Sequence, residues 1–403
     1  MNISDISAIR KCTSCQLCAA VCAKNAISIE LNEDGFYRPV LNEALCVDCG
    51  LCTKVCYKFD SEIKMTSDEQ LSKSHLYAAW AKDGSVVANT TSGGIADLLA
   101  RQLIADGYNV VGVIYDDDEQ AAKHTIASTC NETLAFRGSK YIQSFTFDAF
   151  KHIVKTIKDT KYAVFGTPCQ IYALNKLATL YRKRDNFIFI DLYCHGCPSK
   201  LVWDKYQSYI KSKLQIDHFD KVDFRSKIKG WGGFYVVVVV VDGKIVFKSN
   251  PKEDGFYELF FSDQVLNEGC NDCLLRSTLN YTDIRLGDFW GKKYLSNNDG
   301  VSAISIPTEK GAELFNKIAN AINYEKCNYS EFLPYQSWGK KHLPNTASRK
   351  AIFESLQSKD LSIFDAVRSY RNHQSIKAKI KRNVKTVLYY LPLSVTKCLK
   401  RFL

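Results

Sequence analysis

The sequence predicts an α/β fold of mixed α+β character in three parts: a small cysteine-rich module, an α/β body with a mixed sheet, and a basic helical tail. Three observations support this prediction. Eight of the sixteen cysteines fall between residues 12 and 56, strand-like and helix-like apolar patterns alternate from residue 76 onward, and the end of the chain carries only positive charge. A length of 403 residues is enough for two or three domains.

The N-terminal module repeats one cysteine spacing at an offset of 34 residues. Each run has the form Cys-x2-Cys-x2-Cys-x3-Cys, first from Cys12 and then from Cys46. In this spacing the first three thiolates bind one 4Fe-4S cluster, and the fourth binds the neighbouring cluster. The predicted ligand sets are therefore crossed: Cys12, Cys15, Cys18 and Cys56 for one cluster, and Cys46, Cys49, Cys52 and Cys22 for the other.

Over residues 1–62 this pattern resembles a bacterial two-cluster ferredoxin domain, although Ala23 and Tyr57 stand where proline usually follows the fourth cysteine. Alternating apolar and polar residues over 26–30 and 36–41 predict a hairpin between the two runs. A module of this size buries little apolar surface, so we expect bound clusters to stabilise it. Paired cysteines also form four-thiolate zinc sites, so zinc is the alternative occupant.

Charge and cysteine usage indicate where the protein works. Cysteines in ligand-like spacings indicate a reducing compartment, and we find neither a signal-peptide pattern nor a run of about 20 apolar residues. We therefore expect a cytoplasmic protein. Residues 366–403 hold ten Lys and Arg and no acidic residue, which leaves the body almost neutral and argues against a nucleic-acid partner.

The body follows a polar, aperiodic stretch over residues 60–75, which we interpret as a linker. A strand is predicted at residues 76–80, and the Ser-Gly-Gly sequence at residues 92–94 precedes a helical pattern that begins at Ile95. Small residues before a helix leave backbone N–H groups able to face an anion, so this loop is a candidate phosphate site. An ordinary helix entry is the alternative interpretation.

Further strands are predicted at residues 109–115, 161–165 and 187–191. Strands that alternate with helices imply a mostly parallel sheet, with ligands gathered where the C-terminal ends of the strands open into loops. Cys169 and Cys194 fall at two such ends. Their placement is more informative than either cysteine alone.

The valine-rich stretch over residues 234–241 and the stretch over 244–248 flank an Asp-Gly pair, which predicts a structural hairpin. The segment over residues 136–141 combines two cations, a hydroxyl and an aromatic ring beside a glycine, with a surface turn as its alternative interpretation. Cys270 and Cys273 then form another Cys-x2-Cys pair.

Seven stretches in this order resemble the coenzyme F420 hydrogenase/dehydrogenase beta-subunit family across residues 76–300. They are TSGGI at 91–95, RGSKY at 137–141, GTPCQ at 166–170, DLYCHG at 191–196, FR at 224–225, GW at 230–231, and the Cys270/Cys273 pair leading to GDFWG at 287–291. Together they are specific where each alone would not be. The resemblance implies an N-terminal-like family domain over residues 76–158, a C-terminal-like domain over 160–335, and a separate tail over 336–403.

Members of this family bind FAD beside an iron–sulfur centre, and the resemblance implies a flavin-binding body here. It implies that the flavin phosphates meet Ser92, Gly93 and Gly94, and that Arg137, Ser139 and Lys140 line the same cofactor. It also implies a third 4Fe-4S cluster, with the ligands Cys169, Cys194, Cys270 and Cys273. Four unrelated buried cysteines are the alternative, because free cysteine often behaves as a small apolar residue.

Several assignments stay open at this point. Cys197 stands where the family more usually has an apolar residue, so either Cys194 or Cys197 could be the ligand. Arg137 and Lys140 are the best candidates for a catalytic acid or base. We interpret His195 as a structural hydrogen-bonding residue rather than a base.

These expectations describe an iron–sulfur flavoprotein oxidoreductase that passes electrons between 4Fe-4S clusters and FAD and acts on an unidentified small molecule. Family members with an N-terminal ferredoxin module are often associated with surface-polysaccharide gene clusters, which implies such a role here. No GxGxxG sequence is present, so a ferredoxin-like donor or acceptor protein, or a deazaflavin, is favoured over NAD(P)H. The alternatives are a non-catalytic electron-transfer subunit that docks on a partner enzyme, and a family member that has lost FAD.

The tail shows apolar residues at helical spacing, interleaved with lysine and arginine. These apolar residues are Ile376, Ile380, Val384, Val387, Leu388 and Leu391, and Pro392 follows them. A basic amphipathic helix is typical of contact with a membrane surface, so we expect a peripheral position at the inner face of the membrane. Packing on the protein's own body and binding to a partner are the alternatives.

Overall fold

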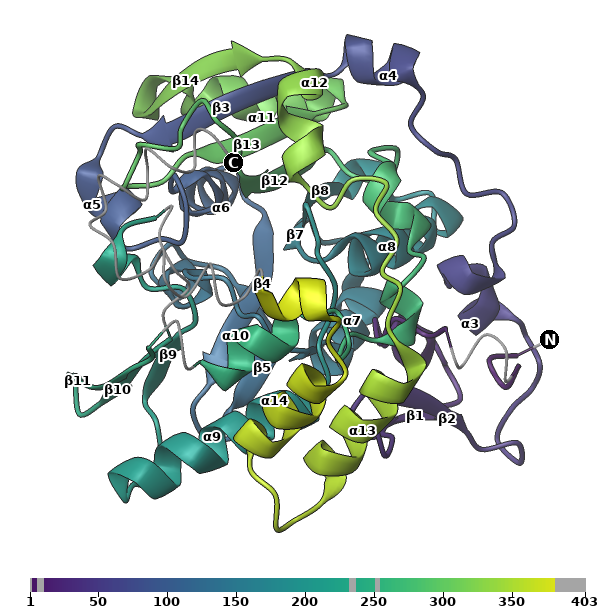
Figure 1. The fold of residues 1–403 in the computed structure, drawn as a ribbon. Coiled ribbons are helices and arrows are strands. Elements are labelled where there is room, and N and C mark those ends of the chain that lie inside the picture. Colours follow the sequence, from purple (N-terminus) through teal and green to yellow (C-terminus); the bar gives the residue numbers. More distant parts are fainter. Residues whose placement is uncertain (1, 6–10, 232–236, 251–253, 381–403) are drawn as a thin grey trace.

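The computed structural model describes residues 2–5, 11–231, 237–250 and 254–380 (Figure 1). In the N-terminal module, strands β1 (Ile27–Leu31) and β2 (Tyr37–Leu41) pair antiparallel, which confirms the predicted hairpin. Helices α2 (Leu17–Ala20) and α3 (Leu51–Lys54) each contain the third cysteine of one run. The repeat in the sequence is therefore also a repeat in the structure.

The body is organised around one sheet, which has nine strands within the described ranges, in the order β14-β3-β13-β12-β8-β7-β4-β5-β6. The strands are β3 (His75–Ala81), β4 (Asn109–Asp116), β5 (Ala121–Ala127), β6 (Ser144–Phe145), β7 (Tyr162–Phe165), β8 (Phe187–Leu192), β12 (Ile284–Asp288), β13 (Ser302–Ile306) and β14 (Ile322–Cys327). These bounds confirm the predicted strands and the mixed α/β class.

The expectation of a mostly parallel sheet is wrong. The central strands β12, β8, β7 and β4 form a continuous parallel block. On one side β13, β3 and β14 run antiparallel to their neighbours, and on the other side β5 is antiparallel to β4 and parallel to β6. The reason is local. Strand β5 follows β4, and β13 follows β12, without a crossover helix, and such direct connections give antiparallel pairs.

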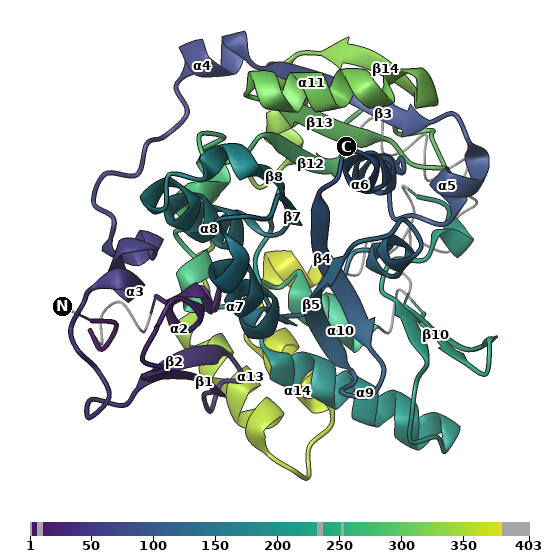
Figure 2. The same ribbon diagram turned by 180° about the vertical axis from the view of Figure 1, so that it is seen from behind.

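Both faces of the parallel block are buried, which explains the continuous apolar sequences of its strands. Phe187 and Phe189 of β8 pack with helices α7 (Phe147–Thr156) and α8 (Pro168–Leu180). Ile188 and Ile190 of β8 pack on the opposite face. That face is covered by α6 (Ile95–Ala105) and α11 (Glu309–Ile318) (Figure 2). Helix α2 also packs on α7 and α8, so the cysteine module rests against this side of the body.

A second core lies beside the sheet. It is built from helices α9 (Lys200–Leu214), α10 (Gly255–Phe260), α13 (Thr346–Gln357) and α14 (Ile363–Asn372), with strands β9 (Lys221–Asp223), β10 (Val238–Val241) and β11 (Lys244–Lys248). Strands β10 and β11 confirm the predicted valine-rich hairpin, whose first residues, 234–236, lie outside the described ranges.

The stretch interpreted as a linker contains a short helix, α4 (Asp68–Lys73), in which no residue is buried. The Ser67 hydroxyl accepts the N–H of Gln70, and the Gln70 side chain accepts the N–H of Ser67. This capping box satisfies two backbone donors that a short helix would otherwise leave unpaired. Two further α-helices of the described body are α5 (Gly84–Ala88) and α12 (Tyr329–Phe332).

The start of the predicted tail helix is described. Residues 376–380 are helical, and the side chains of Ile376 and Ile380 are 78% and 58% exposed. These two residues therefore do not pack on the body. The other predicted positions, Val384, Val387, Leu388, Leu391 and Pro392, lie outside the described residues. Among the helices that are described, none is both long enough and apolar enough to cross a membrane.

Candidate functional site

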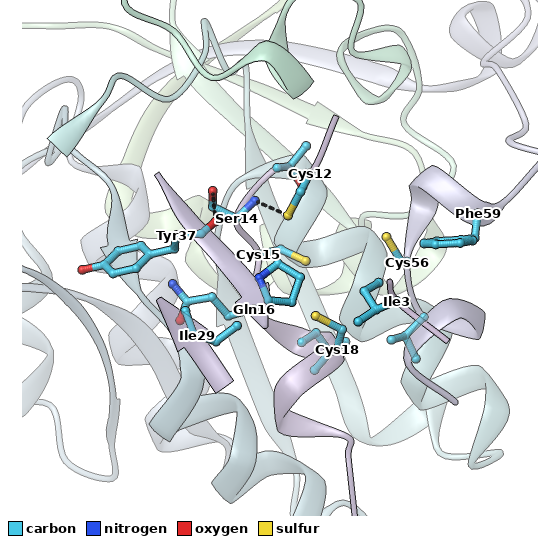
Figure 3. Close-up of a pocket in the computed structure, with 14 residues that line it drawn as sticks. Ile3, Cys12, Ser14, Cys15, Gln16, Cys18, Ile29, Tyr37, Cys56 and Phe59 are labelled. Carbon is cyan, nitrogen blue, oxygen red and sulfur yellow. Dashed lines mark hydrogen bonds between the residues drawn. The ribbon is translucent and has the colours of Figure 1, made fainter. Parts of the chain in front are cut away.

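A hollow in the N-terminal module is lined by four cysteines that come from both runs. They are Cys12, Cys15, Cys18 and Cys56, and Figure 3 shows their sulfur atoms gathered around the same space. Ile3, Val55 and Phe59 complete an apolar wall around them. The structure therefore brings together the crossed set that the spacing predicts, three thiols from the first run and the fourth from the second.

The chemistry of this hollow fits a 4Fe-4S cluster. Ser14 and Gln16 both have positive φ, which winds the 12–18 loop tightly around the thiols, and the Ser14 N–H donates to Cys12 Sγ at 3.4 Å. Burial and then the charge of Cys56 raise the pKa of the Cys15 thiol. Four thiolates gathered in one hollow repel one another unless cations lie among them, and cysteine thiolates are the usual ligands of iron–sulfur clusters.

The other predicted set, Cys22, Cys46, Cys49 and Cys52, lies farther out. Cys52 is buried in an apolar cluster with Ile3 and Ile27, against which Cys22 also packs. Burial raises the pKa of Cys52, and the charge of Cys49 adds to this rise. Cys49 itself is exposed. This set therefore borders solvent on the side of the module where Cys49 lies.

A third group of thiols collects at the end of the parallel block. Cys169 lies in the first turn of α8, directly after β7, and Cys194 follows β8. Burial is the main cause of a raised pKa at Cys194, and the charges of Cys270, Cys169 and Cys273 raise it further. The four predicted ligands are therefore neighbours, which argues against four unrelated cysteines.

Cys197 also lies in this group. Burial and then the charges of Cys270, Cys194 and Cys169 raise its pKa, and its Sγ is 3.8 Å from the Pro198 carbonyl oxygen. Cys194 and Cys197 both lie beside Cys270 and Cys169, so the choice of ligand between them stays a prediction.

The first and third thiol groups lie against each other. Burial and then the charges of Cys56 and Cys169 raise the pKa of Cys15, so thiols of the two groups influence each other. A Cβ on Gly269, next to Cys270, would lie 2.4 Å from the Lys11 carbonyl oxygen. Only glycine allows this close approach of the two backbones.

An aromatic group fills the space beside this contact. The Tyr57 hydroxyl donates to the Gly269 carbonyl at 3.3 Å, and its ring packs edge-on against Tyr172 at 5.9 Å between centroids. Cys169 and Cys273 pack against the same apolar cluster. Tyr57, the residue after Cys56, therefore bridges the two thiol groups.

The two loops assigned to a flavin by resemblance are adjacent. The Ser139 N–H donates to Thr91 Oγ1 at 2.8 Å. A Cβ on Gly93 would lie 2.4 Å from the Ala79 carbonyl oxygen, and Gly94 has φ +82° where α6 begins. Glycine is required at both positions, at the first by close packing and at the second by the backbone angle.

Several residues that are predicted to contact the flavin form hydrogen bonds to other residues of the protein. Arg137 pairs with Asp97 through two hydrogen bonds of 2.8 and 3.2 Å, and Ser92 Oγ donates to the Val301 carbonyl. Lys140 Nζ donates to the carbonyls of residues 135, 136 and 137. Burial and the nearby Lys221 lower the pKa of Lys140 to about 7. Its catalytic role, like that of Arg137, stays a prediction.

One residue beside this loop was missed by the sequence reasoning. Lys227 Nζ donates to the carbonyls of Val87 and Ser92 at 2.5 and 2.7 Å, and burial lowers its pKa to about 8. Its position depends on a contact across 135 residues of chain, which no local pattern signals. Lys227 adds positive charge to the candidate phosphate loop.

The FR, GW and GDFWG stretches meet in one place. Arg225 forms an ion pair with Asp288, whose other oxygen accepts the indole N–H of Trp231 at 3.0 Å. The rings of Trp231 and Trp290 stack at 5.0 Å with an interplanar angle of 8°. These contacts hold the segment that leads to Lys227 against the end of β12.

Comparison with known proteins agrees with these observations. Residues 159–331 match the family model for the C terminus of the coenzyme F420 hydrogenase/dehydrogenase beta subunit, and residues 11–58 match a 4Fe-4S dicluster domain. The second match contains all eight cysteines of the two runs. The predicted iron–sulfur character and the predicted family resemblance are therefore confirmed.

Two individual proteins are similar to the chain. A coenzyme F420 hydrogenase subunit beta from Methanococcus voltae is 28% identical over 261 residues, which are 63% of this chain and 81% of the relative. A chain from the F420-reducing [NiFe] hydrogenase complex of Methanosarcina barkeri is 20% identical, with a TM-score of 0.46, over 68% of this chain and 87% of the other.

Proposed function

We propose that this chain, which resembles the coenzyme F420 hydrogenase/dehydrogenase beta subunit over residues 159–331, is an iron–sulfur flavoprotein oxidoreductase. The observation that carries the proposal is the crossed hollow of Cys12, Cys15, Cys18 and Cys56, which lies against the thiol group of the body. When bound, 4Fe-4S clusters supply single-electron transfer, and FAD joins single electrons to two-electron chemistry. The proposed domain division is 1–62, 76–158, 160–335 and 336–403.

In this proposal the thiol groups form an ordered series from solvent to the body. Cys22, Cys46, Cys49 and Cys52 hold the outer cluster, and Cys12, Cys15, Cys18 and Cys56 the inner one. Cys169, Cys194, Cys270 and Cys273 hold the third. The contact between Gly269 and Lys11 and the ring of Tyr57 lie between the inner and third groups.

The residues proposed to hold the flavin are Ser92, Gly93, Gly94, Arg137, Ser139 and Lys140, with Lys227 added by the structure. Two features support binding of the flavin phosphates by these residues: the glycine loop at the start of α6 and the positive charge of Lys227 beside it. Arg137 and Lys140 shape the loop through their own hydrogen bonds. Lys140, with a pKa lowered to about 7 by burial, is the proposed proton donor or acceptor near the substrate.

The proposed partner is a ferredoxin-like redox protein that docks at the outer thiol group. Cys49 is exposed there, and its neighbours Leu45 and Val47 are 49% and 61% exposed. Apolar side chains around an accessible cofactor suit a small, transient electron-transfer interface. The relative from Methanococcus voltae is named as a hydrogenase subunit, which supports the alternative of a non-catalytic subunit bound to an enzyme. A role in surface-polysaccharide synthesis, with a small-molecule substrate, completes the proposal.

The test is anaerobic purification followed by quantification of iron, acid-labile sulfide and flavin. We expect about twelve irons and one flavin per chain, because three clusters of four irons are proposed. About eight irons without flavin would indicate a family member that has lost FAD. Zinc in place of iron would overturn the proposal altogether.

A kinetic measurement separates the enzyme from the non-catalytic subunit. A reduced ferredoxin is mixed anaerobically with the flavin-loaded protein, and the bleaching of the flavin is followed. We expect rapid bleaching in the wild type and at least about tenfold slower bleaching in Cys169→Ser. Equal rates in the two proteins would exclude the proposed order of thiol groups. Reoxidation of the reduced flavin by added small molecules, without any partner protein, would then favour the enzyme.

A further inference from the structure

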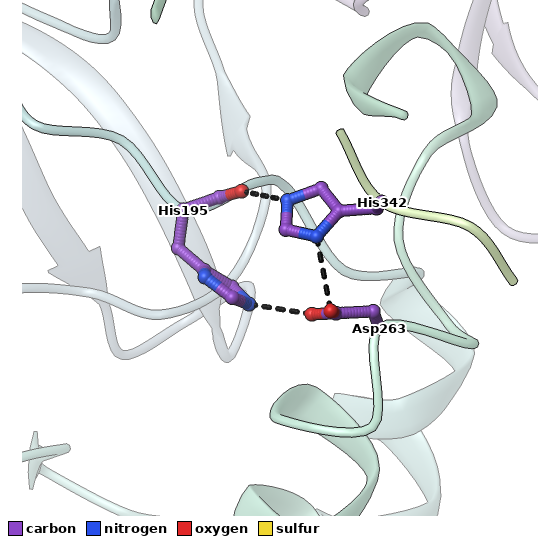
Figure 4. A group of neighbouring side chains, drawn as sticks. All are labelled: His195, Asp263 and His342. Atoms are coloured by element: carbon purple, nitrogen blue, oxygen red, sulfur yellow. Dashed lines mark hydrogen bonds and ion pairs between the residues drawn. The ribbon is translucent and has the colours of Figure 1, made fainter. Parts of the chain in front are cut away.

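We propose that His195, Asp263 and His342 form a binding site for one divalent transition-metal ion, best matched by Zn²⁺, in addition to the cysteine sets (Figure 4). One ring nitrogen of each histidine and one carboxylate oxygen all lie within 4.8 Å of one another. The three residues come from distant parts of the chain: the loop after β8, the turn after α10 and the segment before α13. Two histidines and one carboxylate are a donor set that zinc and other transition metals use.

The hydrogen bonds of His342 leave one of its nitrogens facing a carboxylate. His342 Nε2 lies 2.7 Å from the His195 carbonyl oxygen, which can only accept, so this nitrogen carries a hydrogen. In the neutral ring, Nδ1 therefore presents its lone pair. Nδ1 lies 3.0 Å from Asp263 Oδ2. Two electron-rich atoms at this distance repel each other unless a proton or a metal ion lies between them.

The second histidine has the same arrangement. His195 Nε2 lies 2.8 Å from Asp263 Oδ1, and its other nitrogen, Nδ1, lies 3.5 Å from Ser337 Oγ. A histidine that binds a metal commonly donates its other ring N–H to an oxygen, which fixes the orientation of the ring. Both histidines have such an oxygen partner, and their remaining nitrogens converge on the same carboxylate (Figure 4).

The surroundings suit a bound ion. His342 is 5% exposed. The ring centroids of Phe260 and Phe261 lie 5.3 and 5.9 Å from the ring centroid of His195. These rings limit access of water on one side. The carboxylate of Asp263 is 33% exposed, which leaves a path for the ion to enter. Three protein ligands also leave a fourth position for water, as in many zinc sites.

The position of the site indicates what the ion would do. His195 follows Cys194, and the backbone N–H of His342 donates to the Asn271 carbonyl at 2.8 Å, within the loop between Cys270 and Cys273. An ion held by His195 and His342 would therefore link the two loops that carry the third thiol group. Zinc does not change oxidation state, so it can brace these loops without exchanging electrons with a neighbouring cluster.

The test uses full-length protein with its iron–sulfur sites loaded under anaerobic conditions. Zn²⁺ is added, excess ion is removed, and zinc and iron are counted per chain, while X-ray absorption at the zinc edge identifies the ligand atoms. We expect about one zinc per chain with nitrogen and oxygen ligands at about 2.0–2.1 Å. Zinc misplaced in a cysteine set would show sulfur at about 2.3 Å instead.

Variants locate the ion. His342→Ala and Asp263→Asn should lower bound zinc at least about tenfold, whereas the matched control His218→Ala should keep it, because His218 forms a comparable but half-exposed pair with Asp220. No zinc in the wild type, sulfur ligands, or unchanged zinc in both site variants would overturn the proposal. If a site variant loses its iron and fails to fold, the wild-type absorption spectrum still decides. These results do not depend on whether flavin is bound, so they can fail independently of the proposed function.

Discussion

Single side chains decide how closely the thiol groups approach one another. Gly269 allows the backbone beside Cys270 to meet the backbone of Lys11 and Cys12, and Tyr57 packs beside that contact. Two residues that no metal-binding motif includes therefore contribute to the close contact between the module and the body.

Gly269→Ala tests this role. The added Cβ would lie 2.4 Å from a backbone oxygen that cannot rotate away, so we expect a loss of about 1–3 kcal/mol in stability, as for other overpacked positions. Gly84→Ala is the matched control, because its Cβ would meet nothing within 4 Å. Thermal unfolding of the two anaerobic variants gives the comparison. Equal melting temperatures would show that the close contact does not matter.

Strands β8 and β12 are joined by a buried ion pair that also reaches the third thiol group. Arg285 of β12 forms two hydrogen bonds of 2.7 and 2.5 Å with Asp191 of β8, and both residues are at most 3% exposed. Arg285 also donates to the carbonyls of Leu275 and Arg276, just after Cys273. This arginine therefore positions the loop of Cys273 relative to the strand that leads to Cys194.

Arg285→Ala should lower the free energy of unfolding by about 3–5 kcal/mol, because it leaves a buried carboxylate without its partner. It should also reduce bound iron by about four per chain, through loss of the third cluster. The control is Lys293→Ala, which breaks an exposed pair with Glu325 and should cost at most about 1 kcal/mol. Urea unfolding and iron analysis measure both effects. A full iron content in Arg285→Ala would contradict the positioning role.

The packing of α7 on β5 predicts a dependence of stability on pH. His124 of β5 is 2% exposed and packs against Phe150 of α7, and burial lowers its pKa to about 4. The unfolded chain therefore binds a proton more readily than the folded chain between pH 6.5 and 4. The stabilising effect is complete above pH 6.5 and is lost as the pH falls.

Between pH 7 and pH 5 this histidine should account for a loss of about 2 kcal/mol in stability. His124→Leu removes the titrating group, so its stability should fall less over the same range. Urea unfolding of both proteins at the two pH values measures the difference. Parallel losses in the two proteins would mean that His124 is not the group responsible.

Local patterns predicted the elements better than their arrangement. The alternation of apolar and polar residues over 26–41 predicted the β1–β2 hairpin, and continuous apolar runs predicted β4, β7 and β8. These patterns can be seen locally because they arise from burial of the segment itself. The antiparallel neighbours of the parallel block could not be predicted in this way, since β3 and β13 pair across more than 200 residues of sequence. Helix α4 was missed although its capping sequence, Ser67 with Gln70, is local.

The residues of the candidate sites also fall into those that a local pattern predicts and those that only the folded chain brings together. The crossed thiol set was predictable because iron–sulfur ligation imposes a fixed spacing on nearby cysteines. The role of Lys227 and the group of His195, Asp263 and His342 were not, because their members meet only after the chain has folded. The sequence predicts a structural hydrogen-bonding role for His195, and the proposed metal site would use the same contact with Asp263.

Across the described structure, the cysteine module rests on α7 and α8, on the opposite side of the sheet from the face covered by α6 and α11 (Figure 2). The thiol groups therefore follow one another from the exterior of the module to the end of the parallel strands. The tail begins elsewhere, after α14, with exposed Ile376 and Ile380. The proposed electron entry and the proposed surface attachment therefore involve different parts of the chain.

The proposed membrane contact of the tail can be tested by liposome flotation. Each lysine or arginine near an anionic surface adds about 1 kcal/mol of attraction, so the full chain should float with anionic vesicles and lose this binding in high salt. A chain that ends at Gln374, after α14, should stay in the bottom fraction. Equal flotation of the two chains would reject the membrane proposal and leave partner binding as the alternative.

The central claim is that the two cysteine runs form interleaved ligand sets, and the most direct measurement is the iron content of two double variants. Cys12→Ser with Cys56→Ser removes two ligands of one crossed set, so about eight of twelve irons should remain. Cys52→Ser with Cys56→Ser removes one ligand from each set, so about four should remain. The reverse order of iron contents, or equal contents in the two variants, would contradict the crossed arrangement.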